Sequence, residues 1–94
     1  MILSDAYDVF QASVVASPFV NYKREAFLNA LSPVAMRLDL VRKDLQLITA
    51  LARDLGVSLP ATQAVAEQVA AACAGGFGSQ DMAVLCRFVA REAR

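Results

Sequence analysis

Apolar residues recur along the chain with the period of an α-helix, and no run shows the strict apolar–polar alternation of a strand. The clearest case is residues 38–56, LDLVRKDLQLITALARDLG. At about 100° per residue, its apolar side chains fall within one arc roughly 160° wide. They are Leu40, Val41, Leu45, Leu47, Ile48, Leu51, Ala52 and Leu55. The pattern predicts a half-buried helix that stops at Gly56.

One carboxylate, that of Asp44, lies inside this apolar arc, and Lys43 lies at its border. A charge buried without partners is strongly unfavourable, so the position of Asp44 needs an explanation. Either Asp44 accepts hydrogen bonds from backbone N–H groups of a neighbouring segment, or it lines a site. Chemistry alone leaves the pair Lys43–Asp44 as the candidate functional residues.

Two shorter helices are predicted before the long one. Ser4 caps the first, which should end near Ala16. Ser17 caps the second, with Pro18 at its first position, and this helix should run to about Leu28. The residues expected to face the core are Ala6, Val9, Phe10 and Val14 in the first helix and Phe19, Tyr22, Ala26 and Phe27 in the second. We interpret the aromatic residues as core, not as a ligand cage.

Two further helices are predicted after the long one. A loop covers residues 29–33, and residues 34–38 have no clear backbone state. A fourth helix opens at Pro60 and stops at the glycine run 75–78, and a fifth starts with Ser79 and Asp81. The glycine run lacks a preceding strand and the Gly-Lys-Ser/Thr ending of a phosphate loop. The predicted fold is all-α, with about five helices in a single compact bundle-like domain.

The amino-acid composition limits the classes of binding partner that we expect for this chain. A chain of 94 residues makes one small domain, and its apolar fraction of 57% exceeds the usual ~45–50%. Apolar surface should therefore be left over, which points to a partner subunit or a further domain. Nine basic residues balance nine acidic ones without forming a cluster. Nucleic acid is not expected as a partner, and a DNA-binding helical domain is disfavoured.

The chain has no histidine, and its two cysteines, Cys73 and Cys86, lack the spacing of metal ligands. No metal site and no histidine-based triad are expected. We interpret both thiols as buried core groups, not as a disulfide. There is no signal peptide and no apolar run long enough to span a membrane, so we expect a cytoplasmic protein without membrane contacts.

Three spaced elements resemble a known family. They are Leu38, Leu40 and Lys43-Asp44-Leu45, then Leu55-Gly56-Val57 with Leu59-Pro60, then Gly76-x-Gly78-x-x-Asp81. In this order they resemble the C-terminal helical domain of 3-hydroxyisobutyrate dehydrogenase and related β-hydroxyacid dehydrogenases. The resemblance covers nearly the whole chain and implies the fold of the C-terminal domain of 6-phosphogluconate dehydrogenase. Residues 1–94 would then be the C-terminal, substrate and dimerisation domain.

The family joins such a domain to an N-terminal Rossmann domain through an interdomain helix that carries the catalytic lysine. Neither precedes Met1, so the resemblance implies a fragment or a lone C-terminal domain. By the same resemblance, NAD or NADP would bind to the full-length enzyme, while the isolated chain would be inactive and would bind neither. The implied partners are a second copy, in a homodimer, and the Rossmann domain of the parent enzyme.

The resemblance also assigns roles to three residues, none of them catalytic. Lys43 matches a lysine that reaches the cofactor near the nicotinamide, and Asp44 matches the adjacent aspartate that helps to position the site. Met36 stands where the family often has a phenylalanine close to the nicotinamide. The plainer alternatives are a solvated lysine at the helix edge for Lys43 and a carboxylate bonded to backbone for Asp44. For the whole chain, the alternative is a stand-alone helical dimerisation or interaction module without enzymatic activity.

Overall fold

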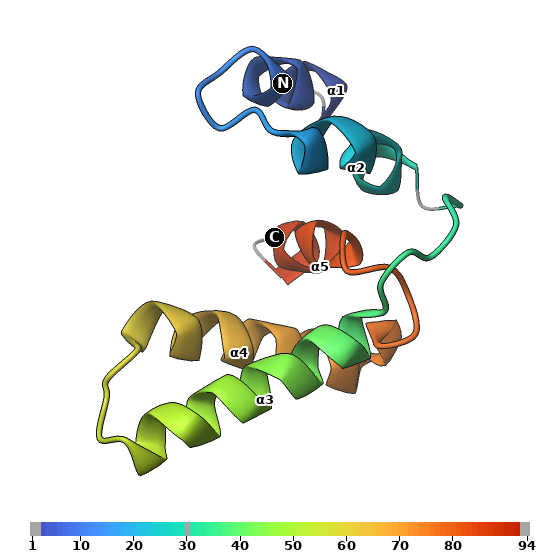
Figure 1. Cartoon of the computed structure of the whole chain (residues 1–94). Coiled ribbons are helices and arrows are strands. Elements are labelled where there is room, and N and C mark those ends of the chain that lie inside the picture. The colour runs from blue at the N-terminus through green and yellow to red at the C-terminus, as the bar shows by residue number, and fades with distance from the viewer. Residues whose placement is uncertain (1–2, 30, 93–94) are drawn as a thin grey trace. The chain divides into compact units, whose positions relative to one another are not determined.

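The computed structural model describes residues 3–29 and 31–92, and these residues form helices and connecting turns without a strand (Figure 1). The α-helices are α1 (Leu3–Gln11), α2 (Pro18–Leu28), α3 (Leu38–Asp54), α4 (Pro60–Ala72) and α5 (Val84–Glu92). A π-type turn, η1 (Cys73–Phe77), follows α4 directly. The predicted all-α class with about five helices is therefore confirmed.

The helices group into two compact units, Met1–Pro33 and Val34–Arg94. Helices α1 and α2 belong to the first unit, and α3, α4, η1 and α5 belong to the second. No described helix is long and apolar enough to cross a bilayer.

In the first unit, α1 ends at Gln11 and not near Ala16 as predicted. The hydroxyl of Ser13 donates a hydrogen bond to the Phe10 carbonyl at 2.8 Å and accepts one from the Val15 N–H at 3.3 Å. Side-chain bonds of this kind compete with the helical backbone ladder and end it early. Ser4 lies inside α1, so its predicted role as the cap is also wrong.

Tyr7 joins α1 to α2 from a buried position. Its hydroxyl donates to the Val20 carbonyl, and its ring lies 5.7 Å from the Phe27 ring between centroids. The Arg24 guanidinium lies 5.5 Å above the Tyr7 ring and pairs with Asp8 at 2.8 Å. Burial raises the pKa of the Tyr7 phenol, and the nearby positive charge of Arg24 opposes this shift.

The predicted inward faces of these two helices are largely wrong. The residues that are exposed instead are Val9, Phe10, Val14, Phe19 and Tyr22. Apolar periodicity gave no weight to Tyr7, whose polar tip finds a carbonyl partner while its ring is buried. The start of α2 is as predicted, because Pro18 occupies its first turn and the Ser17 side chain accepts from the Val20 N–H at 3.2 Å.

In the second unit, α3 and α4 lie side by side around a shared core (Figure 1). The fully packed side chains are Leu38, Val69, Ala72 and Val84. The turn after α3 follows the predicted stop, since Gly56 has φ +68° and the Val57 N–H donates to the Ala52 carbonyl at 2.8 Å. This bond across a left-handed glycine is the Schellman ending of a helix.

Helix α4 opens at Pro60 as predicted and passes into η1, where Gly76 has φ +97°. Helix α5 begins at Val84, later than the predicted start at Ser79 and Asp81. Both cysteines are free thiols, in agreement with the prediction of no disulfide. Cys73 is half-buried, but Cys86 is exposed, so its predicted burial is wrong.

Candidate functional site

The first turn of α3 is attached to the connection between η1 and α5. The Leu38 N–H donates to the Gln80 carbonyl and the Asp39 N–H to the Gly78 carbonyl, each at 2.9 Å. In the other direction, the Met82 N–H donates to the Met36 carbonyl at 2.8 Å. Residues 36–39 thus pair with residues 78–82, which settles the backbone state that the sequence left open.

Asp81 is the buried carboxylate of this attachment. Its Oδ1 accepts hydrogen bonds from the N–H groups of Ala35 at 3.0 Å and Met36 at 3.2 Å. Its Oδ2 accepts from the Ala83 N–H at 2.9 Å, just before α5 begins. One side chain therefore fixes both the segment that enters α3 and the segment that enters α5. The sequence marked Asp81 in a motif but suggested only that it started a helix.

An ion pair and a closely packed glycine flank the first turn of α3. The Arg37 guanidinium contacts the Asp39 carboxylate at 2.6 Å, and this bond lowers the pKa of the Asp39 carboxyl and raises the pKa of Arg37. Gly78 packs closely on the same turn, since a Cβ there would lie 3.4 Å from the Asp39 Cβ. The beginning of α3 is thereby held on both sides.

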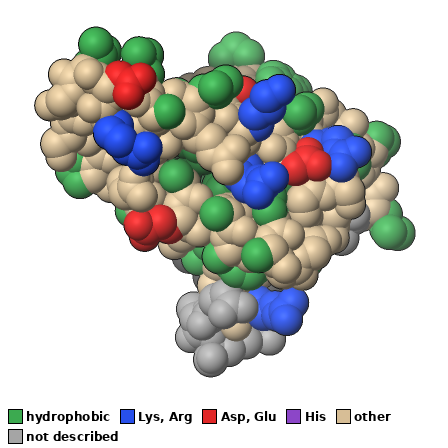
Figure 2. All heavy atoms as spheres, turned by 90° about the horizontal axis from the view of Figure 1, so that it is seen from below, with side chains coloured by type: hydrophobic (Ala, Val, Ile, Leu, Met, Phe, Trp, Pro, Cys, Tyr) green, Lys and Arg blue, Asp and Glu red, His purple; other side chains and the backbone are tan. Residues whose placement is uncertain are grey.

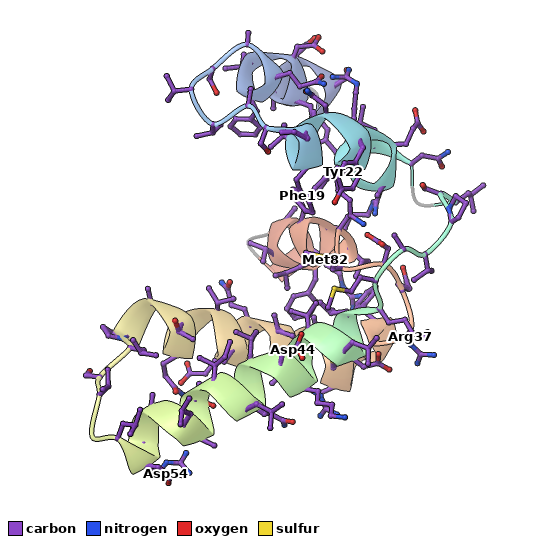
Figure 3. All side chains as sticks on the ribbon, in the orientation of Figure 1. Phe19, Tyr22, Arg37, Asp44, Asp54 and Met82 are labelled. Carbon is purple, nitrogen blue, oxygen red and sulfur yellow. The ribbon has the colours of Figure 1, made fainter. Side chains whose placement is uncertain are left out.

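Lys43 and Asp44 lie in the next turn of α3, and both side chains are exposed. Within residues 3–29 and 31–92, neither makes a side-chain hydrogen bond or a salt bridge. Within these residues, Asp44 therefore does not accept hydrogen bonds from backbone N–H groups, which was the first explanation for its position. Asp81 takes that role instead. Figure 3 shows Asp44 along α3, between Arg37 at its beginning and Asp54 at its end.

The buried side of α3 is narrower than the sequence predicted. Leu38, Val41, Leu45 and Ala52 are packed against the core or buried. The remaining apolar residues of the arc, here called the α3 stripe, are 46% to 67% exposed. They are Leu40, Leu47, Ile48, Leu51 and Leu55. Figure 2 likewise shows apolar side chains at many points of one molecular face, among lysine, arginine and acidic groups.

Two cavities lie at the end of α3 opposite to its attachment. The first, about 280 Å³, is lined by polar and apolar residues that include Thr49, Arg53 and Gln63. The second, about 160 Å³, is lined by apolar residues from Ile48 to Leu59. Neither of these two cavities is lined by Met36, Lys43 or Asp44. Lys43 and Asp44 are exposed on α3, and Met36 is half-buried.

The arrangement so far is an all-α module with an exposed lysine and aspartate one turn beyond a firmly attached helix start. Residues 1–89 match the family model described as "NAD-binding of NADP-dependent 3-hydroxyisobutyrate dehydrogenase". The chain therefore belongs to this family of NAD-binding domains of 3-hydroxyisobutyrate dehydrogenase-like enzymes. A search of curated proteins found no match.

Two of the candidate residues have side chains whose chemistry suits parts of a nicotinamide dinucleotide. The exposed ammonium of Lys43 is a strong donor suited to phosphate or carboxamide oxygens. Met36 is half-buried beside the attachment and offers an apolar, adaptable side chain. Because Lys43 is exposed and Met36 is only half-buried, a ligand held by them would take most of its contacts from elsewhere.

Proposed function

We propose that this chain is the C-terminal helical domain of an NAD(P)-dependent β-hydroxyacid dehydrogenase of the 3-hydroxyisobutyrate dehydrogenase type. In this proposal it supplies one wall of the active-site cleft and pairs as a homodimer. A Rossmann domain, which binds the dinucleotide at its glycine-rich turn, supplies the other wall. The chain alone transfers no hydride.

The observation that carries the proposal is the presentation of Lys43 in a chain that matches the family over residues 1–89. The three backbone bonds between residues 36–39 and 78–82 and the bonds of Asp81 hold the turn that precedes Lys43. A site on a rigid element is more precise than one on a loop. The ammonium has no ionic partner within the described residues and is available to a ligand.

Each residue has a limited task in this proposal. The bound NAD(P) supplies the hydride acceptor when it is present. Lys43 donates hydrogen bonds to its polar groups near the nicotinamide, and Met36 covers an apolar part of the ring. Asp44 lies beside Lys43 and helps to orient the site. None of the three transfers a proton to or from the substrate.

The first experiment reads the genomic DNA upstream of the codon for Met1. The proposal expects an in-frame Rossmann fingerprint, Gly-x-Gly-x-x-Gly after a strand, followed by a long helix. A stop codon in that frame without such a segment would remove the enzyme interpretation.

In the enzyme that contains this chain, Lys43→Ala should raise the KM for NAD(P) about tenfold, the size expected when a charged hydrogen bond is lost. The KM for the hydroxyacid should change much less. The matched control is Arg42→Ala, which removes an exposed cation from the adjacent position on the other side of α3. Steady-state kinetics with each ligand varied in turn measure both constants. Equal effects of the two variants on the cofactor KM would contradict the assignment.

The exposed α3 stripe favours a second candidate, a stand-alone helical interaction module without enzymatic activity. This function predicts stable association of the 94-residue chain and no binding of NADH. The sequence upstream of Met1 distinguishes the two functions, because both predict that this chain associates and that it binds no NADH alone. Sedimentation velocity tests the association that the two functions share. A monomer at high concentration would contradict the homodimer in both.

A further inference from the structure

The α3 stripe is an apolar helix face that carries a single charge. On a helical wheel drawn at about 100° per residue, Asp44 falls between Leu51 and Leu55. Along the helix its surface neighbours are Leu40, Leu47 and Ile48, which lie three or four residues away. All of these side chains and Asp44 itself are exposed. An exposed apolar face of this size marks a surface that a partner covers.

Covering the stripe would also take the Asp44 carboxylate out of water. A carboxylate buried without a partner is strongly unfavourable, and a close opposite charge or donor offsets the loss. Within the described residues, Asp44 has no hydrogen bond or salt bridge that could serve this purpose. The group that neutralises Asp44 must therefore come with the partner.

A second copy of the stripe does not meet this requirement. The apolar arc contains no lysine or arginine, because Lys43 stands at its border and Arg42 and Arg53 lie on the other side of the helix. Two stripes packed together would bury two carboxylates without a cation between them. The homodimer of the proposed function would then use another surface of the chain.

We propose that the α3 stripe is the docking site for an amphipathic helix of a partner segment, which inserts apolar side chains along Leu40–Leu55 and one lysine or arginine opposite Asp44. Apolar anchors at helical spacing give such a contact its affinity, and the charge pair fixes its register. Lys43, at the border of the stripe, stays accessible to a ligand beside the docked helix. The inference shares Asp44 with the proposed function but does not use Lys43, and its test measures peptide binding and not cofactor kinetics, so failure of either test leaves the other standing.

The test uses the whole chain and two synthetic amphipathic peptides of about five helical turns. Both carry a leucine stripe, with lysine at the central position of one and glutamate at the same position of the other. Fluorescence anisotropy of the labelled peptides should show that the lysine peptide binds about tenfold more tightly, the ratio expected for one close charge pair. Equal affinities, or no binding of the lysine peptide to the folded chain, would overturn the proposal.

Three variants locate the contact. Asp44→Asn should remove the preference for the lysine peptide, and Leu51→Gln should weaken the binding of both peptides. Asp54→Asn removes a carboxylate nearly three turns further along α3, too far to face a lysine placed opposite Asp44, and should not change the preference for the lysine peptide. Circular dichroism of each variant checks that the helices remain. If the chain dimerises and Leu51→Gln makes it monomeric, a second copy covers the stripe and the proposal is wrong.

Discussion

At the scale of single residues, two aspartates show what sequence periodicity can and cannot predict about burial. Asp44 stands out in the sequence because apolar residues surround it on the helical wheel, yet its side chain is exposed. Asp81 has no such pattern around it, yet it is buried and binds three backbone N–H groups. Periodicity tells which residues share a face, but the partners of a side chain depend on segments that are distant in the sequence.

Removal of the Asp81 carboxylate should destabilise the chain. Asp81→Ala leaves the N–H groups of Ala35, Met36 and Ala83 without their acceptor, and a buried unsatisfied group is costly. We expect a loss of about 3 kcal/mol in the free energy of unfolding, measured by urea titration with circular dichroism. The control Asp54→Ala removes an exposed carboxylate near the end of α3, where the helix dipole disfavours it, and should be neutral or stabilising. Similar losses for both variants would contradict this role of Asp81.

Tyr7 should give an alkaline limit to stability. The chain has two tyrosines, so Tyr22→Phe leaves Tyr7 as the phenol seen by ultraviolet absorbance. Burial raises the pKa of Tyr7, so in the folded chain the phenol should ionise above the ordinary value of about 10. The contribution of protonated Tyr7 to folding stability is fully present below the ordinary pKa of tyrosine. It is lost as the pH rises through the raised pKa of the folded chain, because the unfolded chain loses the proton first. A titration midpoint at or below that of free tyrosine would contradict the buried position.

At the scale of elements, the turn and cap chemistry was the most predictable part of the fold. Pro18, Gly56 and Pro60 mark helix boundaries for reasons that are local, a fixed φ or a left-handed turn, and the structure has them as predicted. The ends of α1 and the beginning of α5 were wrong because nonlocal or side-chain bonds decide them. Ser13 ends α1, and the pairing of residues 78–82 with residues 36–39 delays α5.

Gly56, which follows α3, should be needed only for its left-handed backbone conformation. Gly56 has φ +68°, and a Cβ there would meet no atom within 4 Å. Gly56→Ala should therefore cost about 1 kcal/mol, the penalty for a left-handed residue with a side chain. Gly75 is the matched control, because its φ is not positive and an added Cβ would make ordinary contacts of 3.7 Å with Phe77 and Phe88. Measured by thermal unfolding, the Tm should fall for Gly56→Ala and stay unchanged for Gly75→Ala. An equal fall in Tm for Gly75→Ala would contradict the special role of the left-handed backbone at Gly56.

At the scale of the whole molecule, the sequence predicted the all-α class because helical periodicity and stop signals recur throughout the chain. It also predicted surplus apolar surface from composition, and the exposed α3 stripe agrees with this. The exposure of Asp44 was not predictable, because a helical wheel shows the apolar side of α3 without showing what covers it. The division into two units was likewise hidden, since residues 29–33 look like any loop.

The unit Val34–Arg94 should survive cleavage of the connection that precedes it. Leu31 is 91% exposed, and thermolysin cuts before exposed apolar residues, so it should cut there early. The core of Leu38, Val69, Ala72 and Val84 and the bonds of Asp81 all lie after this position. We therefore expect a fragment beginning at Leu31 that keeps its helical circular dichroism and unfolds cooperatively. Leu31→Asp should slow this first cut, as followed by mass spectrometry over time. Degradation of the whole chain without this intermediate would show that the second unit depends on the first for its stability.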